Sequence, residues 1–166
     1  AESEEFMLRK DKSQIPKGIN PDSWFSTLND WQARGIGNFN SLDSSDEETR
    51  VIISNPAYGP ICAGFIASTF EVSSNRRYRF RWVESKKQSL ILSLLPDDSK
   101  VPPPKEKFQT WSQEDFQISN LDLFDTLEIG HNGSWSIFGN RCMTIHLDLI
   151  QRFADYCITY LNQIHT

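Results

Sequence analysis

One stretch in the middle of the chain constrains the fold most, because three different patterns follow one another there with turn-forming residues between them. Residues 50–54 form a short β-branched run that is typical of a buried strand, and Asn55-Pro56 predicts a turn after it. Between residues 59 and 70, apolar side chains recur at helical spacing. Residues 77–84 then alternate basic and aromatic side chains, and residues 88–95 are more uniformly apolar. The stretch therefore predicts a strand, a helix and a two-stranded hairpin.

The remaining elements extend this pattern on both sides. Residues 23–34 predict a helix, since two tryptophans, a phenylalanine and a leucine share one of its faces. Residues 127–145 carry an Asn-Gly turn and a Gly-Asn turn between short apolar runs, which predicts a three-stranded meander. Residues 147–164 repeat apolar side chains at spacings of three and four, as an amphipathic helix does. The predicted fold class is α+β, with an antiparallel sheet of about five strands packed by two to three helices.

The chain is predicted to form one domain with two less regular segments. Residues 1–20 are polar and charged, so we expect a flexible N-terminal arm, and residues 21–166 form a single α+β domain. Residues 96–107 hold three consecutive prolines and predict a surface loop. Because the chain begins with alanine, we interpret it as a processed product or a fragment of a longer chain.

Composition excludes several functional classes. A formal charge of −5 and a pI near 5.2 argue against a general nucleic-acid-binding surface. Cys62, Cys142 and Cys157 contain no C-x-x-C pair, so neither a disulfide framework nor a zinc site is predicted. No run is long and apolar enough to span a membrane, and the N-terminus has no secretory pattern. We therefore expect a cytoplasmic protein without a metal or cofactor.

Catalytic motifs are scarce. The sequence has no glycine-rich phosphate loop, no nucleophile elbow and no histidine pair at metal-ligand spacing. Cys142 and His146 form the one candidate nucleophile and base, but a strand-to-helix change between them leaves their contact undetermined. We predict no catalytic residues, and enzymatic activity is not expected.

The basic cluster in residues 76–87 contrasts with the acidic chain around it. If residues 77–84 form a strand, three arginines share one face and three aromatic side chains share the other. The arginine face can be an ordinary solvated surface, or it can bind an anionic ligand or the acidic surface of a partner protein. It can also be neutralised within the chain by the acidic loop at 43–48. Single-stranded nucleic acid is disfavoured because basic and aromatic side chains point in opposite directions.

Residues 34–95 contain a series of segments in a characteristic order. They are Arg34-Gly35-Ile36-Gly37, a variable acidic loop, the strand at 50–54 with Asn55-Pro56, the segment from Pro60 to Phe65, an aromatic strand ending at Glu84 and a final apolar strand. Together these segments resemble the vinyl-reductase-type sensor domains. The resemblance implies an antiparallel sheet with packed helices, dimerisation, and binding of a small hydrophobic or aromatic molecule that controls an attached output domain. The cysteines that usually follow the position of Glu84 in that family are absent here, so no metal- or thiol-dependent role is carried over.

Two functions are therefore predicted. The first is a non-enzymatic ligand-binding or sensor domain, with a small hydrophobic molecule buried between sheet and helices by aromatic side chains. The residues expected to bind it are Trp24, Trp31, Phe65, Phe70 and Trp82. The alternative is an interaction module, either a homodimer or a heteromer, that uses the small-residue helix face at 63–68 and the basic strand at 77–81. The residues expected at that interface are Gly64, Ser68, Arg77, Arg79 and Arg81.

Overall fold

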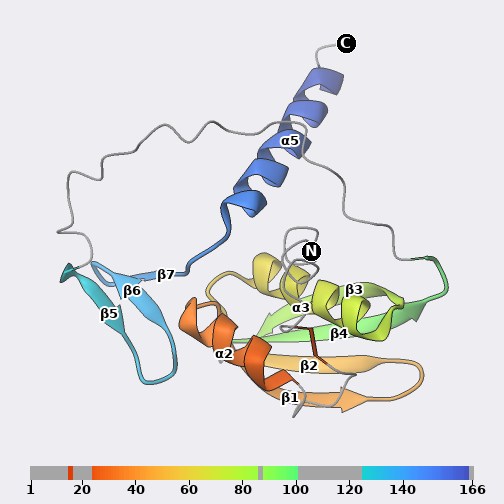
Figure 1. Ribbon diagram of the computed structural model, residues 1–166, viewed down its shortest axis with the longest axis horizontal. Coiled ribbons are helices and arrows are strands. Elements are labelled where there is room, and N and C mark those ends of the chain that lie inside the picture. The colour runs from red at the N-terminus through yellow and green to blue at the C-terminus, as the bar shows by residue number, and fades with distance from the viewer. Residues whose placement is uncertain (1–14, 17–23, 86–87, 101–124, 165–166) are drawn as a thin grey trace.

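The computed structural model describes residues 15–16, 24–85, 88–100 and 125–164 (Figure 1). Within them, three helices and two antiparallel sheets are present. The helices are α2 (Phe25–Ala33), α3 (Gly59–Ser74) and α5 (Leu147–Ile164). The main sheet has the order β1-β2-β4-β3, formed by β1 (Asn38–Ser44), β2 (Thr49–Ser54), β3 (Arg77–Ser85) and β4 (Ser89–Asp97). The small sheet consists of β5 (Leu127–Ile129), β6 (Trp135–Ile137) and β7 (Asn140–Cys142).

This arrangement confirms the predicted α+β class, with antiparallel sheets packed by helices. The predicted meander is also confirmed, because β6 pairs antiparallel with both β5 and β7. The predicted arm at residues 1–20 lies almost wholly outside the described residues. Most of the predicted loop at 96–107 does too, although its first two residues, Pro96 and Asp97, belong to β4. No helix in the described part of the chain has the length and apolarity needed to cross a membrane.

The hydrophobic core lies between one face of the main sheet and the helices α2 and α3 (Figure 1). Strand pairing sets Val51 opposite Leu92 and Ile53 opposite Leu90, so these side chains point to the same face. On the other side of β4, Trp82 pairs with Leu92. The aromatic side of β3 therefore faces the helices, as the alternation of residues 77–84 predicts, and the arginine side faces away.

Helix α3 supplies most of the helical contribution to the core. Proline stands in its first turn, where a missing N–H costs nothing, and Asn75 ends it in the left-handed conformation at φ 51°. Its residues from Cys62 to Phe70 are all buried. Small side chains among them allow α3 to pack closely while Phe65 and Phe70 fill the core.

The small sheet approaches the main body at the turn between α2 and β1. Gly35 adopts φ +70° there, and a Cβ at this position would lie 2.9 Å from Trp135 Cγ of β6. Both the backbone conformation and the close contact favour glycine. The Gly35 turn therefore lets β6 lie directly against the end of α2.

Helix α5 is attached mainly at its N-terminal end and projects away from the main sheet (Figure 1). The backbone N–H of Thr144 donates to Arg34 O at 2.8 Å. Arg34 Nη1 donates to His146 Nε2 at 2.9 Å, and its Nη2 lies 2.6 Å from Asp30 Oδ2. The guanidinium also lies 5.5 Å from the centre of the Phe65 ring. This buried arginine joins α2, α3 and the segment that leads into α5.

Candidate functional site

Four of the five aromatic residues predicted to bind a ligand lie together in the core. Trp24 contacts Trp31, with ring centroids 6.2 Å apart, and Phe70, with centroids 4.7 Å apart. Trp24, Trp31, Phe65 and Phe70 are all buried. These rings are in direct contact with one another and with the aliphatic side chains of β2 and β4, so they form a packed interior.

Trp82 is placed apart from these four rings. It lies on β3, which pairs only with β4 and therefore forms one edge of the main sheet. Its side chain is 38% exposed, and Phe80 beside it on the same face is 41% exposed. Trp82 instead borders the start of α3, where its Cζ3 atom lies 3.2 Å from the position that a Cβ atom would occupy if Gly59 carried one.

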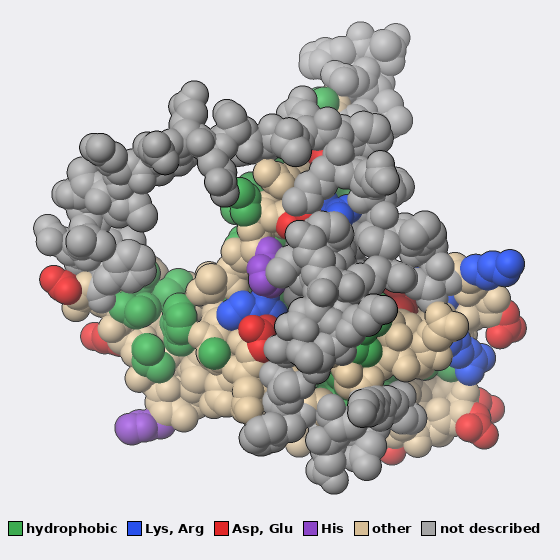
Figure 2. Space-filling view, viewed as in Figure 1, with side chains coloured by type: hydrophobic (Ala, Val, Ile, Leu, Met, Phe, Trp, Pro, Cys, Tyr) green, Lys and Arg blue, Asp and Glu red, His purple; other side chains and the backbone are tan. Residues whose placement is uncertain are grey.

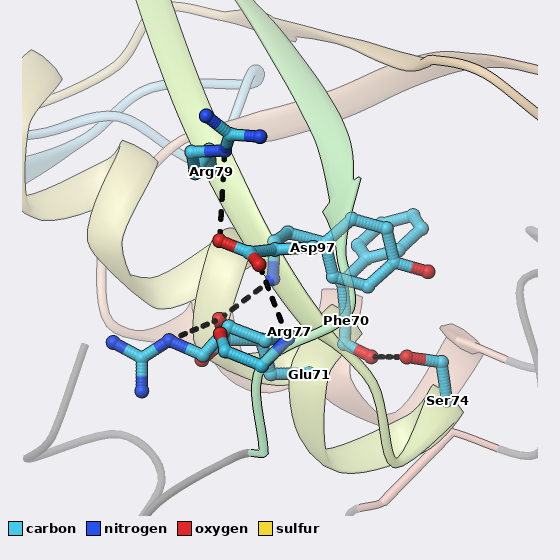
Figure 3. A network of polar contacts seen from close by, with 8 residues as sticks. Phe70, Glu71, Ser74, Arg77, Arg79 and Asp97 are labelled. Atoms are coloured by element: carbon cyan, nitrogen blue, oxygen red, sulfur yellow. Dashed lines mark hydrogen bonds and ion pairs between the residues drawn. The ribbon is translucent and has the colours of Figure 1, made fainter.

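The residues predicted to form an interface are also divided. Gly64 and Ser68 are buried inside the protein. Arg77 Nε lies 3.7 Å from Glu71 Oε1, and Arg79 Nε lies 3.5 Å from Asp97 Oδ2 (Figure 3). Carboxylates at the end of α3 and in β4 thus partly neutralise these two arginines, while Arg81 is exposed on the open sheet face. Only the arginines of the predicted interface reach the surface.

A hollow of about 670 Å³ lies at one end of the main sheet. Three segments that are distant in the sequence form its walls: the turn from β2 to α3, the β3–β4 hairpin, and the small sheet with its turn. The lining residues are Asn55, Pro56, Ala57, Tyr58, Gly59, Glu84, Ser85, Gln88, Ser89, Asn132, Ser134 and Arg141. Its volume is within the range of small-molecule sites.

Arg141 holds two of these walls together. Its Nη1 donates to Trp135 O at 3.1 Å and to Cys142 O at 2.8 Å. Its Nη2 donates to Gly35 O at 2.8 Å and to Asn55 O at 3.1 Å. Burial lowers the pKa of the guanidinium, although an arginine remains charged at any pH at which a protein folds. All four partners are neutral carbonyls, so this positive charge meets no carboxylate among the described residues.

Two residues of the hollow have an uncommon backbone conformation. Asn55 has φ 50° and Gln88 has φ 53°, and the backbone N–H of Asn55 donates to Gln88 O at 2.8 Å. Asparagine tolerates this left-handed region, but an unbranched side chain such as that of glutamine adopts it at a cost. Such residues concentrate at functional sites, where surrounding contacts hold them.

The start of α3 contributes to the same wall. Tyr58 precedes the helix, its side chain is 58% exposed, and no side chain caps the first turn. Uncapped N–H groups and the helix dipole favour a negative group at this end. The hollow therefore combines a cation, a helix N-terminus and an exposed aromatic ring, and the carboxylate of Glu84, its one acidic lining residue, lies against Gly59 at this end of the helix.

The two residues of the candidate nucleophilic pair each accept a hydrogen bond from an arginine. His146 Nε2 accepts a hydrogen bond from Arg34, since a guanidinium can only donate. Cys142 is partly buried, and its carbonyl accepts from Arg141. Within the described residues, no three His, Cys, Asp or Glu side chains gather as metal ligands would.

Sequence reasoning did not identify the residues of this hollow. Asn55-Pro56 and Asn132-Gly133 were interpreted as turns alone, although turns held by a rigid scaffold often carry binding residues. Arg141 had one available signal, because it is the single Asp, Glu, Lys or Arg residue between Glu128 and Asp148. The convergence of three distant turns, however, depends on tertiary structure and has no local sequence signature.

Comparison with protein-family models, curated proteins and solved structures finds no significant match to this chain. The resemblance to vinyl-reductase-type sensor domains therefore stays a prediction, and the site is interpreted from its own geometry.

Proposed function

We propose that the chain is a non-enzymatic binding module that takes a small aromatic anion in the hollow between α3, the β3–β4 hairpin and the small sheet. The observation that carries the proposal is that Arg141, whose charge meets no carboxylate among the described residues, shares this hollow with the start of α3. Both features favour a negative group at one location. The Nη hydrogens of Arg141 are donated to four carbonyls, so its contribution is the electrostatic attraction of its charge.

The aromatic part of the proposed ligand follows from the rest of the wall. Tyr58 exposes its ring in the hollow, and Trp82 borders the same end of α3. An aromatic group placed against these rings gains stacking and buried area. Amide and hydroxyl side chains around it, such as Asn55 and Ser89, offer hydrogen bonds that fix its orientation.

We place the ligand in this hollow rather than among the four buried rings predicted from the sequence. Trp24, Trp31, Phe65 and Phe70 already contact one another and their neighbours. A ligand placed among them would have to displace packed side chains. Overpacking of this kind costs roughly 1–3 kcal/mol for each group. The hollow needs no such displacement.

A sensor role is a further part of the proposal. Gly59 begins α3 at the hollow, while the rest of α3 crosses the core and ends beside β3. A ligand that contacts this end can favour one placement of α3 over another and so change the surface that an associated partner meets. The resemblance to sensor domains supports the same interpretation.

Titration with 2-naphthoate, followed by ¹H–¹⁵N NMR shifts of the full chain, tests the proposal. Shifts are expected at residues 55–59, 84–89 and 132–141. Tyr58→Ala should weaken binding by roughly three- to tenfold, the loss expected for one aromatic contact. Phe138→Ala removes an equally exposed ring outside the hollow and should leave binding unchanged.

Two results would refute the proposal. One is the absence of shifts at about millimolar 2-naphthoate, the weakest affinity that a specific site of this size would show. The other is a set of shifts confined to α5 or to the open sheet face. If an uncharged analogue, 2-naphthamide, binds equally well, the proposal that Arg141 selects an anionic ligand is wrong.

A further inference from the structure

Helix α5 exposes its apolar side. Phe153 is 68% exposed, and Leu147 and Leu161 are each 52% exposed. Ile150 and Ile158 are 42% and 48% exposed, so five large apolar side chains on one helix meet solvent. An exposed apolar surface of this extent marks an interaction site in a folded protein.

The opposite, polar side of α5 is the buried one. Asp148, Gln151 and Arg152 are all buried, and Arg152 Nε donates to Asp148 Oδ2 at 2.7 Å. Turning the apolar side inward would expose this ion pair and would move the helix away from its attachment at Arg34 and His146. The structure therefore fixes which side of α5 is left for a partner.

Three of these exposed residues lie on a regular seam along the helix. We name as the α5 seam the residues that alternate at spacings of three and four, as the a and d positions of a coiled coil do. They are Leu147, Ile150, Ala154, Cys157 and Leu161, of which Ala154 and Cys157 are partly buried. Large side chains occupy both ends of the seam and small ones its centre, and Phe153 flanks the centre.

We propose that the α5 seam pairs with the α5 seam of a second copy of this chain. The seam is self-complementary. Whether the two helices run parallel or antiparallel, the large side chains at the ends of one seam meet those of the other, and the small side chains meet at the centre. The exposed flanking residues that the structure describes, Phe153 and Ile158, hold no charge, so a two-fold pair suffers no like-charge repulsion there. This surface is separate from the hollow, and the inference does not depend on the proposed ligand.

The available area supports a pair of this kind. The five exposed side chains leave about 500 Å² of apolar surface on each copy, so a two-fold pair buries about 1,000 Å² in total, the threshold for a specific interface. A lipid surface is a poorer occupant, because the polar side of α5 carries Asp148, Arg152 and Asp155 rather than the basic residues that favour anionic membranes.

Sedimentation equilibrium of the full chain tests the pair. The wild-type protein is expected at twice the 19.2 kDa of one chain, with dissociation on dilution over a ~100-fold range of concentration. Leu161→Glu places a charge in the α5 seam and Phe153→Glu places one beside its centre, and each should weaken dimerisation by at least about tenfold. Phe138→Glu is the matched control, since Phe138 is 69% exposed but belongs to the turn after β6. Figure 2 shows that hydrophobic side chains are also exposed over the small sheet.

Disulfide cross-linking tests the same contact without a disruptive substitution. In a Cys142→Ser background, a parallel pair brings the two Cys157 thiols together, and an antiparallel pair brings Cys157 to the Ala154→Cys thiol of the other copy. A cross-linked dimer in either variant supports the proposal. A monomer at every concentration, a dimer that Phe153→Glu leaves intact, or a monomer that sediments with phosphatidylcholine vesicles overturns it.

Discussion

Cys62 shows how burial decides the chemistry of a single residue in this fold. It is buried in α3, and its Sγ donates to Ile36 O at 3.4 Å. Burial raises the pKa of its thiol, because the charged thiolate is disfavoured in an apolar environment. Since the thiolate is the reactive form, Cys62 is an inert core residue although it carries a nucleophilic atom.

We expect iodoacetamide to distinguish Cys62 from the partly buried Cys142 in the folded protein. At neutral pH Cys142 should be alkylated first, and Cys62 only at the rate at which the protein unfolds. Raising the pH toward 9 should still leave Cys62 slow to react, because burial raises the pKa of its thiol and keeps it protonated. Mass-spectrometric mapping of the alkylated peptides measures both rates, and equal rates in the native state would contradict the structure.

Single residues also show what the sequence could and could not predict. The alternation in residues 77–84 correctly placed Tyr78, Phe80 and Trp82 on one face of β3. It could not predict that β3 would lie at an edge of the sheet, because strand order depends on pairings between distant residues. Trp82 is therefore half exposed, whereas Trp24 and Trp31 are buried.

At the scale of elements, the junction between α3 and β3 depends on one carboxylate. Glu71 Oε1 accepts from the backbone N–H of Tyr78 at 3.0 Å and lies 3.7 Å from Arg77 Nε (Figure 3). The Glu71 side chain is 12% exposed, so both contacts are shielded from water. This contact fixes the position at which the chain leaves the helix and enters the sheet.

Replacing Glu71 should loosen that junction. Glu71→Ala is expected to lower the free energy of unfolding by about 1–2 kcal/mol, because the N–H of Tyr78 loses its acceptor. Glu71→Gln should cost less, since its amide oxygen can still accept that hydrogen bond. Urea denaturation measures both changes, with Glu47→Ala in an exposed loop as the control. A loss as large for Gln as for Ala would show that the charge, rather than the hydrogen bond, stabilises the junction.

Element prediction failed at β1 for a physical reason. Residues 38–44 are mostly polar, and the register of β1 against β2 shifts between Phe39 and Ser41, which interrupts the alternation of a regular strand. An edge strand also needs few apolar residues, since it contributes less to the core. The helix at 59–70 and the strands at 50–54 and 88–95 were predicted because they carry the buried apolar pattern.

For the whole molecule, the predicted fold class was confirmed, while the relation between the two sheets could not be inferred from sequence. Apolar periodicity identifies the elements that carry a buried apolar pattern but contains no information about which turns meet. That information lies in isolated polar residues such as Arg141, whose four carbonyl partners belong to the α2–β1 turn, the β2–α3 turn and the small sheet. The hollow exists because these contacts hold the small sheet beside the main one.

Arg141→Lys should therefore separate the two sheets without unfolding the main one. A lysine ammonium has three donors on one nitrogen and cannot reach four carbonyls arranged around a planar guanidinium. Hydrogen exchange of amides in β5–β7 should accelerate by at least about tenfold, while amides of β2 and β4 keep their protection. Binding of 2-naphthoate should weaken in the same variant, because the wall formed by the small sheet moves.

Lys100→Met, a charge removal beyond the end of β4, is the control. If exchange instead rises equally in both sheets, Arg141 stabilises the fold as a whole, and the small sheet is not a separately attached wall.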